Sequence, residues 1–284
     1  MKTNKFFKNF SISLVSLWLG LFAVIPFSLV LVCSFLTPSE SSIVSWHFNL
    51  NNYTQLFDGI YFKILVRSLE LASLCSFVCL VLGYPAAFIL ARLRSRYKPL
   101  FLLLLVIPFW TSSLIRSYAI LAILKTQGLL NTLLLSIGLI HEPLNLLYTN
   151  TAVLIGCVYN LLPFMILPLY ANIEKLDNNL IDAAQDLGAT RFKTFKDIII
   201  PLTIPGIMAG ILLVFLPSIT LFYIPTILGG AKSLLLGNLI ENQFLIMQDW
   251  PGGSATSIAL TALMLPLIWL QQYFSKKTNE AELL

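Results

Sequence analysis

The chain has 284 residues, of which 57% are hydrophobic and only 11% are charged, and its mean hydropathy is +0.84. Ordinary globular chains carry about 25% charged residues, so this composition excludes a water-soluble domain and indicates an integral membrane protein. The net charge is +5, but the basic residues stand at the ends of apolar segments, which argues against a nucleic-acid-binding surface. All four cysteines (Cys33, Cys75, Cys79 and Cys157) lie in apolar runs, so we expect neither a disulfide nor a metal site.

Six apolar segments are long enough to cross a bilayer, which takes about 20 helical residues. They cover residues 10–36, 64–91, 100–124, 150–173, 202–225 and 255–274. The first exceeds the ~7–15 apolar residues of a signal peptide, so we interpret it as a retained helix. The apolar stretch 128–140 is too short to span and is predicted to be interfacial or re-entrant. We therefore predict one all-α membrane domain over residues 1–284, with six transmembrane helices.

The basic residues near the span ends predict the orientation, because an excess of Lys and Arg marks the cytoplasmic side. With the N-terminus inside, thirteen of the 18 Lys and Arg residues fall in cytoplasmic segments and four fall on the opposite side. The cytoplasmic set is Lys2, Lys5, Lys8, Arg92, Arg94, Arg96, Lys98, Lys175, Arg191, Lys193, Lys196, Lys276 and Lys277. The outer set is Lys63, Arg67, Lys125 and Lys232. We expect both termini and the loop 174–201 to face the cytoplasm.

The loop 174–201 is predicted to begin with a short amphipathic helix. Asp177, Asn178 or Asn179 can cap its start, and Gly188 can end it. Apolar side chains recur three or four residues apart, with acidic residues on the other face. These apolar residues are Leu180, Ala183, Ala184 and Leu187. A second helical run is expected over 189–200. Amphipathicity alone would also suit an ordinary solvated loop.

The spacing in this loop resembles the EAA loop of ABC-importer permeases, whose pattern is Glu-Ala-Ala, three residues, Gly, nine residues, Ile, one residue and Leu-Pro. The matching residues here are Asp182, Ala183, Ala184, Gly188, Ile198, Ile200 and Pro201. Asp replaces Glu and Ile replaces Leu, and every interval is kept. The resemblance implies the type I importer (MetI-like) permease fold, with a coupling helix that docks into a groove on a separate ATPase subunit.

The same resemblance implies roles and partners. Asp182 would offer a charge-assisted contact, Ala183 and Ala184 would allow close approach, and Gly188 would permit a sharp turn. Expected partners are two ATP-binding subunits, a second homologous permease and an extracytoplasmic substrate-binding protein, in a bacterial inner membrane. ATP and Mg would be used by the partner subunits. We expect no catalytic residue, metal or bound cofactor in this chain, and Ala231 stands where a phosphate-binding Walker loop needs glycine.

Other stretches indicate a cargo. Residues 108–116, 228–232, 237–244 and 249–251 resemble the permease subunits of spermidine/putrescine importers, which implies polyamine transport. Thr226 is a departure, because an acid is expected there in many such permeases. The contribution of this subunit to binding a cationic cargo is therefore left open by the pattern.

Candidate residues for the transport pathway lie within or beside the spans. Trp110, Phe222 and Tyr223 could hold an ammonium group on their ring faces, although most membrane aromatics only pack or anchor. Glu70 and Arg116 are expected at similar depth, where they would pair as a structural ion pair or as part of the pathway. Glu241 and Asp249 lie in an outer segment and could meet a delivered substrate or its carrier protein.

Three alternatives remain at this point. The first is an importer permease for another solute, such as an anion, sulfate or an amino acid. The second is an intramembrane enzyme, which would need paired carboxylates, a Ser/His set or a metal cluster at membrane depth, whereas His47 and His141 both fall in outer loops. The third is a standalone ion-driven transporter, which leaves the spacing of the loop 174–201 unexplained.

Overall fold

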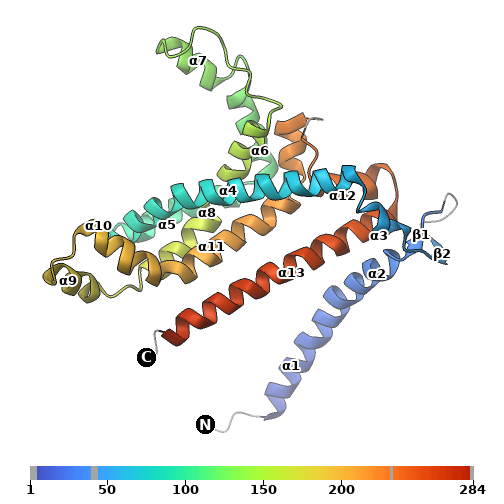
Figure 1. Cartoon of the computed structure of the whole chain (residues 1–284), viewed down its shortest axis with the longest axis horizontal. Helices are drawn as coiled ribbons and strands as arrows, with labels where there is room; N and C mark the ends of the chain where they lie inside the picture. The colour runs from blue at the N-terminus through green and yellow to red at the C-terminus, as the bar shows by residue number, and fades with distance from the viewer. Residues whose placement is uncertain (1–4, 40–43, 231–232, 282–284) are drawn as a thin grey trace. The chain divides into compact units, whose positions relative to one another are not determined.

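The computed structural model describes residues 5–39, 44–230 and 233–281 (Figure 1). The chain divides into two compact units, one formed by Met1–Phe62 with Leu239–Leu263 and the other by Lys63–Asn238 with Met264–Leu284. Among the residues that the structure describes, six helical segments are long and apolar enough to cross a membrane, which is the number predicted. They are Lys8–Cys33, Gly59–Arg92, Ser113–Ser136, Asn150–Ile173, Arg191–Thr220 and Trp250–Trp269.

The first unit combines apolar helices with a small hairpin. Its elements are α1 (Lys5–Leu19), the π-helical turn η1 (Gly20–Val24), α2 (Ile25–Cys33), β1 (Leu36–Thr37), β2 (Ser45–Phe48), α3 (Asn51–Gln55), the π-helical turn η6 (Asn242–Ile246) and the first part of α13 (Trp250–Ala281). The strands pair antiparallel. Buried Asn52 donates to the carbonyls of Ser34 and Leu36 at 3.1 and 2.8 Å and so fixes α3 beside the hairpin. The all-helical prediction did not include this hairpin.

The second unit holds the longer series of helices. Its elements are α4 (Gly59–Arg92), α5 (Lys98–Val106), the 3-10 helix η2 (Ile107–Trp110), α6 (Ser113–Leu124), α7 (Leu129–Ser136), α8 (Asn150–Ile173), α9 (Asn178–Asp186), α10 (Arg191–Thr194), the π-helical turn η3 (Phe195–Ile199), α11 (Ile200–Thr220), the π-helical turn η4 (Pro225–Gly229) and the start of α12 (Leu236–Glu241). The bounds of α8 are those predicted from the apolar pattern.

The centre of this unit is the contact between α8 and α11 (Figure 1). Glycines on α11 let the two backbones approach: a Cβ at Gly210 would lie 2.6 Å from Met165 Sδ, and one at Gly206 would lie 2.7 Å from Asn172 Cβ. Small residues are typical of membrane helix interfaces because packing, and not water exclusion, holds such helices together. Met165 and Leu169 on α8 are consequently fully buried.

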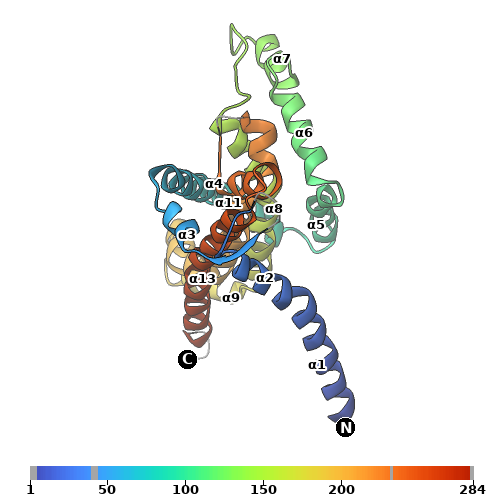
Figure 2. The same ribbon diagram turned by 90° about the vertical axis from the view of Figure 1, so that its right-hand side faces the viewer.

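The third expected span, 100–124, is not one helix. Pro108 lies in η2, and Thr111 and Ser112 have extended backbone angles before α6 begins. Proline lacks the N–H that would continue the helical ladder. The Pro108 carbonyl accepts from the Thr111 hydroxyl at 2.7 Å and from the Thr111 backbone N–H at 3.3 Å, which closes η2 before α6 begins. In Figure 2, α5, α6 and α7 follow one another as separate segments, with α7 at the far end of α6. The short helix expected within 128–140 is α7, which the candidate span Ser113–Ser136 includes. Its interfacial or re-entrant position stays a prediction.

The fifth expected span, 202–225, also has different limits. The helical run from Arg191 to Thr220 continues through Pro201, which directly follows the π-helical turn η3 at the start of α11. The helix then stops at Leu221 and Phe222, and η4 follows after Ile224. The helical run expected over 189–200 therefore continues into the membrane helix, and a break lies inside the expected span, beside Phe222.

Candidate functional site

The short helix α9 in the loop 174–201 is closed at both ends by local hydrogen bonds. The Asp177 carboxylate accepts from the Asn179 backbone N–H at 2.9 Å, so Asp177 is the N-cap among the three predicted candidates. At the other end, Gly188 has a φ of 83°. The backbone N–H groups of Gly188 and Ala189 donate to the carbonyls of Gln185 and Ala184 at 2.9 and 3.0 Å. This is a Schellman ending, and it confirms the predicted turn at Gly188.

The two faces of α9 differ from the predicted arrangement. Ile181 and Ala184 are buried and attach the helix to the rest of its unit. Leu180 is 50% exposed and Leu187 is 89% exposed, and Ala183 and Asp182 are exposed as well. The predicted apolar set is therefore split: Ala184 faces inward, while Leu180, Ala183 and Leu187 form an outward stripe beside the acidic residues. An exposed apolar stripe on a polar loop is a feature of a docking surface.

The second half of the loop is continuous with the membrane helix. Thr190 caps α10 by accepting from the Lys193 N–H at 3.3 Å. Ile198 is half-buried in η3, and exposed Pro201 lies in the first turn of α11. The helical run from Arg191 reaches Thr220, so α10, η3 and α11 form one continuous helical segment.

Two contacts tie this loop to neighbouring helices, and a third joins α4 to the start of α11. Lys98, at the start of α5, forms a 3.0 Å ion pair with Glu174 at the end of α8. A hydrogen bond from Tyr170, and then the pair with Lys98, hold the pKa of Glu174 below its ordinary value. The Tyr84 and Thr203 hydroxyls lie 3.0 Å apart, and the Phe195 ring packs edge-on against Tyr84, 5.7 Å between centroids.

Phe222 and Tyr223 lie at the break after α11. Their rings form an edge-to-face pair with centroids 5.9 Å apart, and Phe222 is 42% exposed. The Phe222 carbonyl accepts from the Thr226 hydroxyl and from the buried amide of Asn238, both at 2.8 Å. Asn238 also donates to the Thr226 hydroxyl at 2.7 Å. Interrupted helices with polar groups at the break are typical of membrane binding sites.

Trp110 and Arg116 lie on either side of the break between η2 and α6. Trp110 is 78% exposed. Half-buried Arg116 places its guanidinium 5.1 Å from the Phe109 ring centroid, and its Nε has no hydrogen-bond partner within the described part of the chain. Glu70 is exposed on α4, and among the described residues it forms no ion pair with Arg116. The predicted Glu70–Arg116 pair is therefore wrong.

The two candidate acids of the outer segment belong to the first unit. Glu241 is half-buried at the end of α12. Asp249 precedes α13, and its carboxylate accepts from the Gly252 N–H at 3.0 Å. This is the geometry of a helix N-cap, so Asp249 has a structural function that the sequence pattern did not indicate.

Comparison with known proteins identifies the family. Residues 80–280 match the model of the binding-protein-dependent transport system inner membrane component. The chain belongs to this family. The described part of the chain contains six helices that are long and apolar enough to cross a membrane. Together with these helices, membership makes the chain a multi-pass protein of the bacterial inner membrane and a transport subunit, not an enzyme.

Relatives of this inner membrane component cover it almost completely. The chain is 49% identical over 284 residues to the spermidine/putrescine transport system permease protein PotB of Salmonella typhimurium, covering 99% of both chains. Identity to PotB of Escherichia coli K12 is 51% over 268 residues, covering 93% of this chain and 98% of that one. Identity to PotB of Haemophilus influenzae is 47%, covering 97% and 96%. The predicted family resemblance is thus confirmed.

Solved structures agree on the fold of this inner membrane component. A chain of a bacterial ABC transporter involved in the import of the acidic polysaccharide alginate superposes with a TM-score of 0.77 at 16% identity, covering 95% of this chain and 96% of that one. A chain of a bacterial alginate ABC transporter in complex with alginate pentasaccharide-bound periplasmic protein superposes with a TM-score of 0.77 at 15% identity, covering 95% of this chain and 94% of that one. These likenesses confirm the importer-permease fold.

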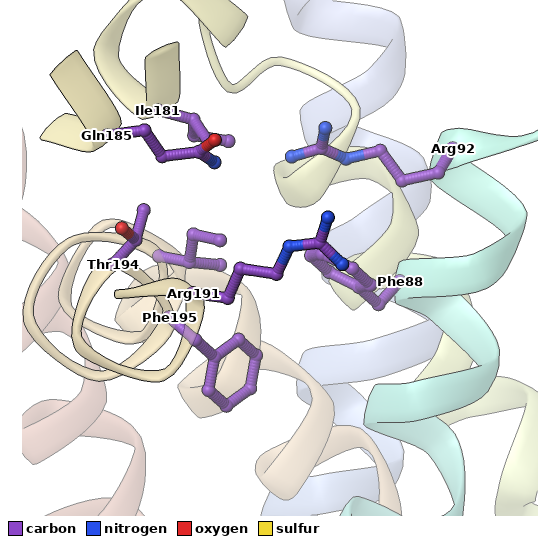
Figure 3. A pocket seen from close by; sticks show the side chains of 8 residues that line it. Phe88, Arg92, Ile181, Gln185, Arg191, Thr194 and Phe195 are labelled. Carbon is purple, nitrogen blue, oxygen red and sulfur yellow. The ribbon is translucent and has the colours of Figure 1, made fainter. Parts of the chain in front are cut away.

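Sequence reasoning missed two features of this inner membrane component. The sequence pattern indicated Asn238 only as a member of the stretch 237–244, and not as a side chain that stabilises the break at Phe222. Arg92 and Arg191 were counted only as orientation signals, although they line one pocket between α4 and the loop 174–201 (Figure 3). The second could have been suspected because both arginines fall in segments that were predicted to lie on the same side of the membrane.

Proposed function

We propose that this inner membrane component is the permease subunit of an ATP-driven polyamine importer. The observation that carries the proposal is the identity of 47–51% to spermidine/putrescine permeases over nearly the whole chain. The substrate would be spermidine or putrescine, delivered by an extracytoplasmic binding protein. A second, homologous permease would complete the pathway. The chain itself would bind no cofactor.

The loop 174–201 is the proposed site of energy input. In the orientation that the basic residues favour, it faces the cytoplasm. The outward stripe of Leu180, Ala183 and Leu187, with Asp182 beside it, would enter a groove on one of two ATPase subunits, which use ATP and Mg. Gly188, Ile198 and Pro201 would keep the loop in the shape that fits the groove. Closure of the ATPases would then move α11 through the continuous helix from Arg191.

The proposed pathway passes the helix break at Phe222. Phe222, Tyr223 and exposed Trp110 offer ring faces to an ammonium group, each interaction contributing about 0.5–2 kcal/mol. Thr226 carries no charge, so cation binding on this subunit would rest on aromatic and polar groups. Glu70, Glu241, Asp249 and Arg116 stay candidates for the pathway, with Asp249 and Arg116 also having the structural contacts described above.

Association tests the proposed docking surface. Leu187→Asp places a charge on the most exposed residue of the stripe without touching the buried face of α9. We expect this variant to insert normally but to lose co-purification with the ATPase, whereas Leu187→Met keeps it. Full ATPase binding by Leu187→Asp would refute docking at this stripe.

Growth tests the proposed cargo. In a strain that can neither make nor import polyamines, the chain expressed with its partner subunits should restore growth on added spermidine or putrescine. The control is the same set of partners without this chain. Restored sulfate or amino acid uptake without polyamine uptake would replace the cargo assignment and keep the importer assignment.

A further inference from the structure

A pocket of about 410 Å³ lies between the end of α4 and the loop 174–201 (Figure 3). Its lining residues all belong to the second unit and are Phe88, Arg92, Ile181, Gln185, Arg191, Thr194, Phe195 and Ile199. Phe195 packs edge-on against Phe88, 6.2 Å between centroids, and Ile181 and Ile199 are buried. The pocket therefore has an apolar floor that belongs to the packed core.

The open side of the pocket is strongly basic. Figure 3 shows the guanidinium groups of Arg92 and Arg191 extending from opposite walls toward the same space, with the Gln185 amide on the same side. No carboxylate lines the pocket, and neither arginine forms an ion pair among the described residues. Arg92 lies over the Phe88 ring, 5.2 Å from the centroid, which fixes its direction. Two converging cations repel each other, so an anion between them would be stabilised.

The position of the two arginines matches a membrane boundary. Arg92 is the last residue of the apolar helix α4, and Arg191 is the first residue of the apolar run that ends at Thr220. Each guanidinium therefore stands where a membrane span meets its polar loop, and the apolar wall of Phe88 and Phe195 continues into the spans. Basic pockets at such boundaries suit phosphate-bearing lipid headgroups, because guanidinium forks bind phosphate oxygens in pairs.

We propose that this pocket binds a phosphate group between Arg92 and Arg191, with Gln185 as a further donor. The source is either the headgroup of an anionic phospholipid, whose acyl chains would follow the apolar wall, or free phosphate. Such a ligand contacts α4 and both halves of the loop 174–201 at once. Its presence would hold the loop against the membrane helices and make the loop position sensitive to the anion. This site is independent of the cargo and of the ATPase docking stripe.

Native mass spectrometry of the full delipidated chain in detergent tests the site. The probes are dioleoylphosphatidylglycerol, dioleoylphosphatidylcholine and inorganic phosphate. The test variant is R92Q/R191Q, and the matched control is R96Q/K193Q, which removes two exposed charges from the same segments outside the pocket lining. Thermal unfolding of each variant checks that the fold is kept.

We expect wild type and R96Q/K193Q to prefer phosphatidylglycerol over phosphatidylcholine, and R92Q/R191Q to lose that preference by about tenfold or more. Free phosphate is identified as the source if inorganic phosphate displaces the lipid from wild type. It is also identified if wild type shows no lipid preference but binds inorganic phosphate, and R92Q/R191Q loses that binding. Equal binding of every probe by wild type and R92Q/R191Q overturns the proposal and leaves an acidic partner side chain as the counterpart of the arginines.

Discussion

Gly188 adopts a left-handed backbone conformation, and a side chain at this position would clash with no neighbouring atom. Its φ is 83°, and a Cβ added there would meet nothing within 4 Å. We predict that Gly188→Ala raises the energy of the α9 ending by about 1–2 kcal/mol through backbone strain alone. Amides 187–189 should then exchange hydrogen roughly tenfold faster. The same amides should exchange more slowly in Gly188→Asn than in Gly188→Ala, since Asn tolerates this backbone conformation better. Wild-type exchange in both variants would contradict the strain argument.

Glu174 links pH to the attachment of the loop 174–201. Its pKa is held below the ordinary value of 4.5 by Tyr170 and Lys98, so its stabilising contribution is present above pH 4.5 and is lost as pH falls through the folded-state pKa. The Lys98–Glu174 pair is partly exposed, so we predict that Glu174→Gln lowers the free energy of unfolding by less than about 1 kcal/mol at neutral pH.

Thermal unfolding of the purified chain across pH measures this effect. The difference between wild type and Glu174→Gln should shrink as the pH falls below 4.5. Lys98→Met should lower the unfolding temperature by about as much as Glu174→Gln does. The double variant should lower it little further than either single change. A difference that grows toward acid pH would reverse the assigned sign of the linkage.

Predictions about single residues were right where they depended on neighbours within a few positions of the chain. The prediction that depended on residues of two different helices was wrong. The N-cap among Asp177 to Asn179 and the turn at Gly188 follow from side-chain chemistry within a few residues. The Glu70–Arg116 pair was inferred from heights along an assumed continuous helix. Because the helix breaks at Thr111 and Ser112, the height of Arg116 cannot be counted along one helix. The Arg116 guanidinium instead lies over the Phe109 ring.

The contact between α8 and α11 depends on glycine at defined heights. A side chain at Gly206 would meet Asn172 Cβ at 2.7 Å and the Pro168 carbonyl at 3.2 Å, so the backbones would have to separate. We predict that Gly206→Val destabilises the chain by about 1–3 kcal/mol and lowers its folded yield in detergent. Gly20→Val is the matched control, because open space surrounds that position in an apolar helix. Equal yields for both variants would rule out close packing at Gly206.

The ends of a helix could be predicted where a capping residue or a charged residue marks the end of its apolar run. The limits of α8 follow from the Thr149 cap, whose hydroxyl accepts from the Ala152 N–H, and from the charge at Glu174. Pro108 and Pro201 look alike in sequence, yet the helix breaks soon after the first, at Thr111 and Ser112, and continues through the second. The difference depends on neighbouring hydrogen bonds, such as the one from Thr111, which the apolar pattern does not encode. The hairpin of β1 and β2 is too short to give a periodic signal.

At the scale of the molecule, the family followed from a few spaced residues in the loop 174–201. Intervals between Asp182, Gly188, Ile198 and Pro201 are set by the length of two short helices, so they survive changes in the surrounding apolar residues. The solved relatives at 15–16% identity keep the fold but carry another cargo in their names, which shows that the fold does not specify the substrate. The single-domain organisation, the orientation and the role of each site residue stay predictions.

Substrate-stimulated ATP hydrolysis by the assembled transporter tests the central claim, that this chain couples ATPase subunits to polyamine passage. The assembly is reconstituted in proteoliposomes with its binding protein, carrying either wild-type chain or Leu187→Asp. We predict that spermidine or putrescine stimulates hydrolysis with wild type and not with Leu187→Asp, and that sulfate has no effect. Stimulation by sulfate with none by either polyamine would contradict the account.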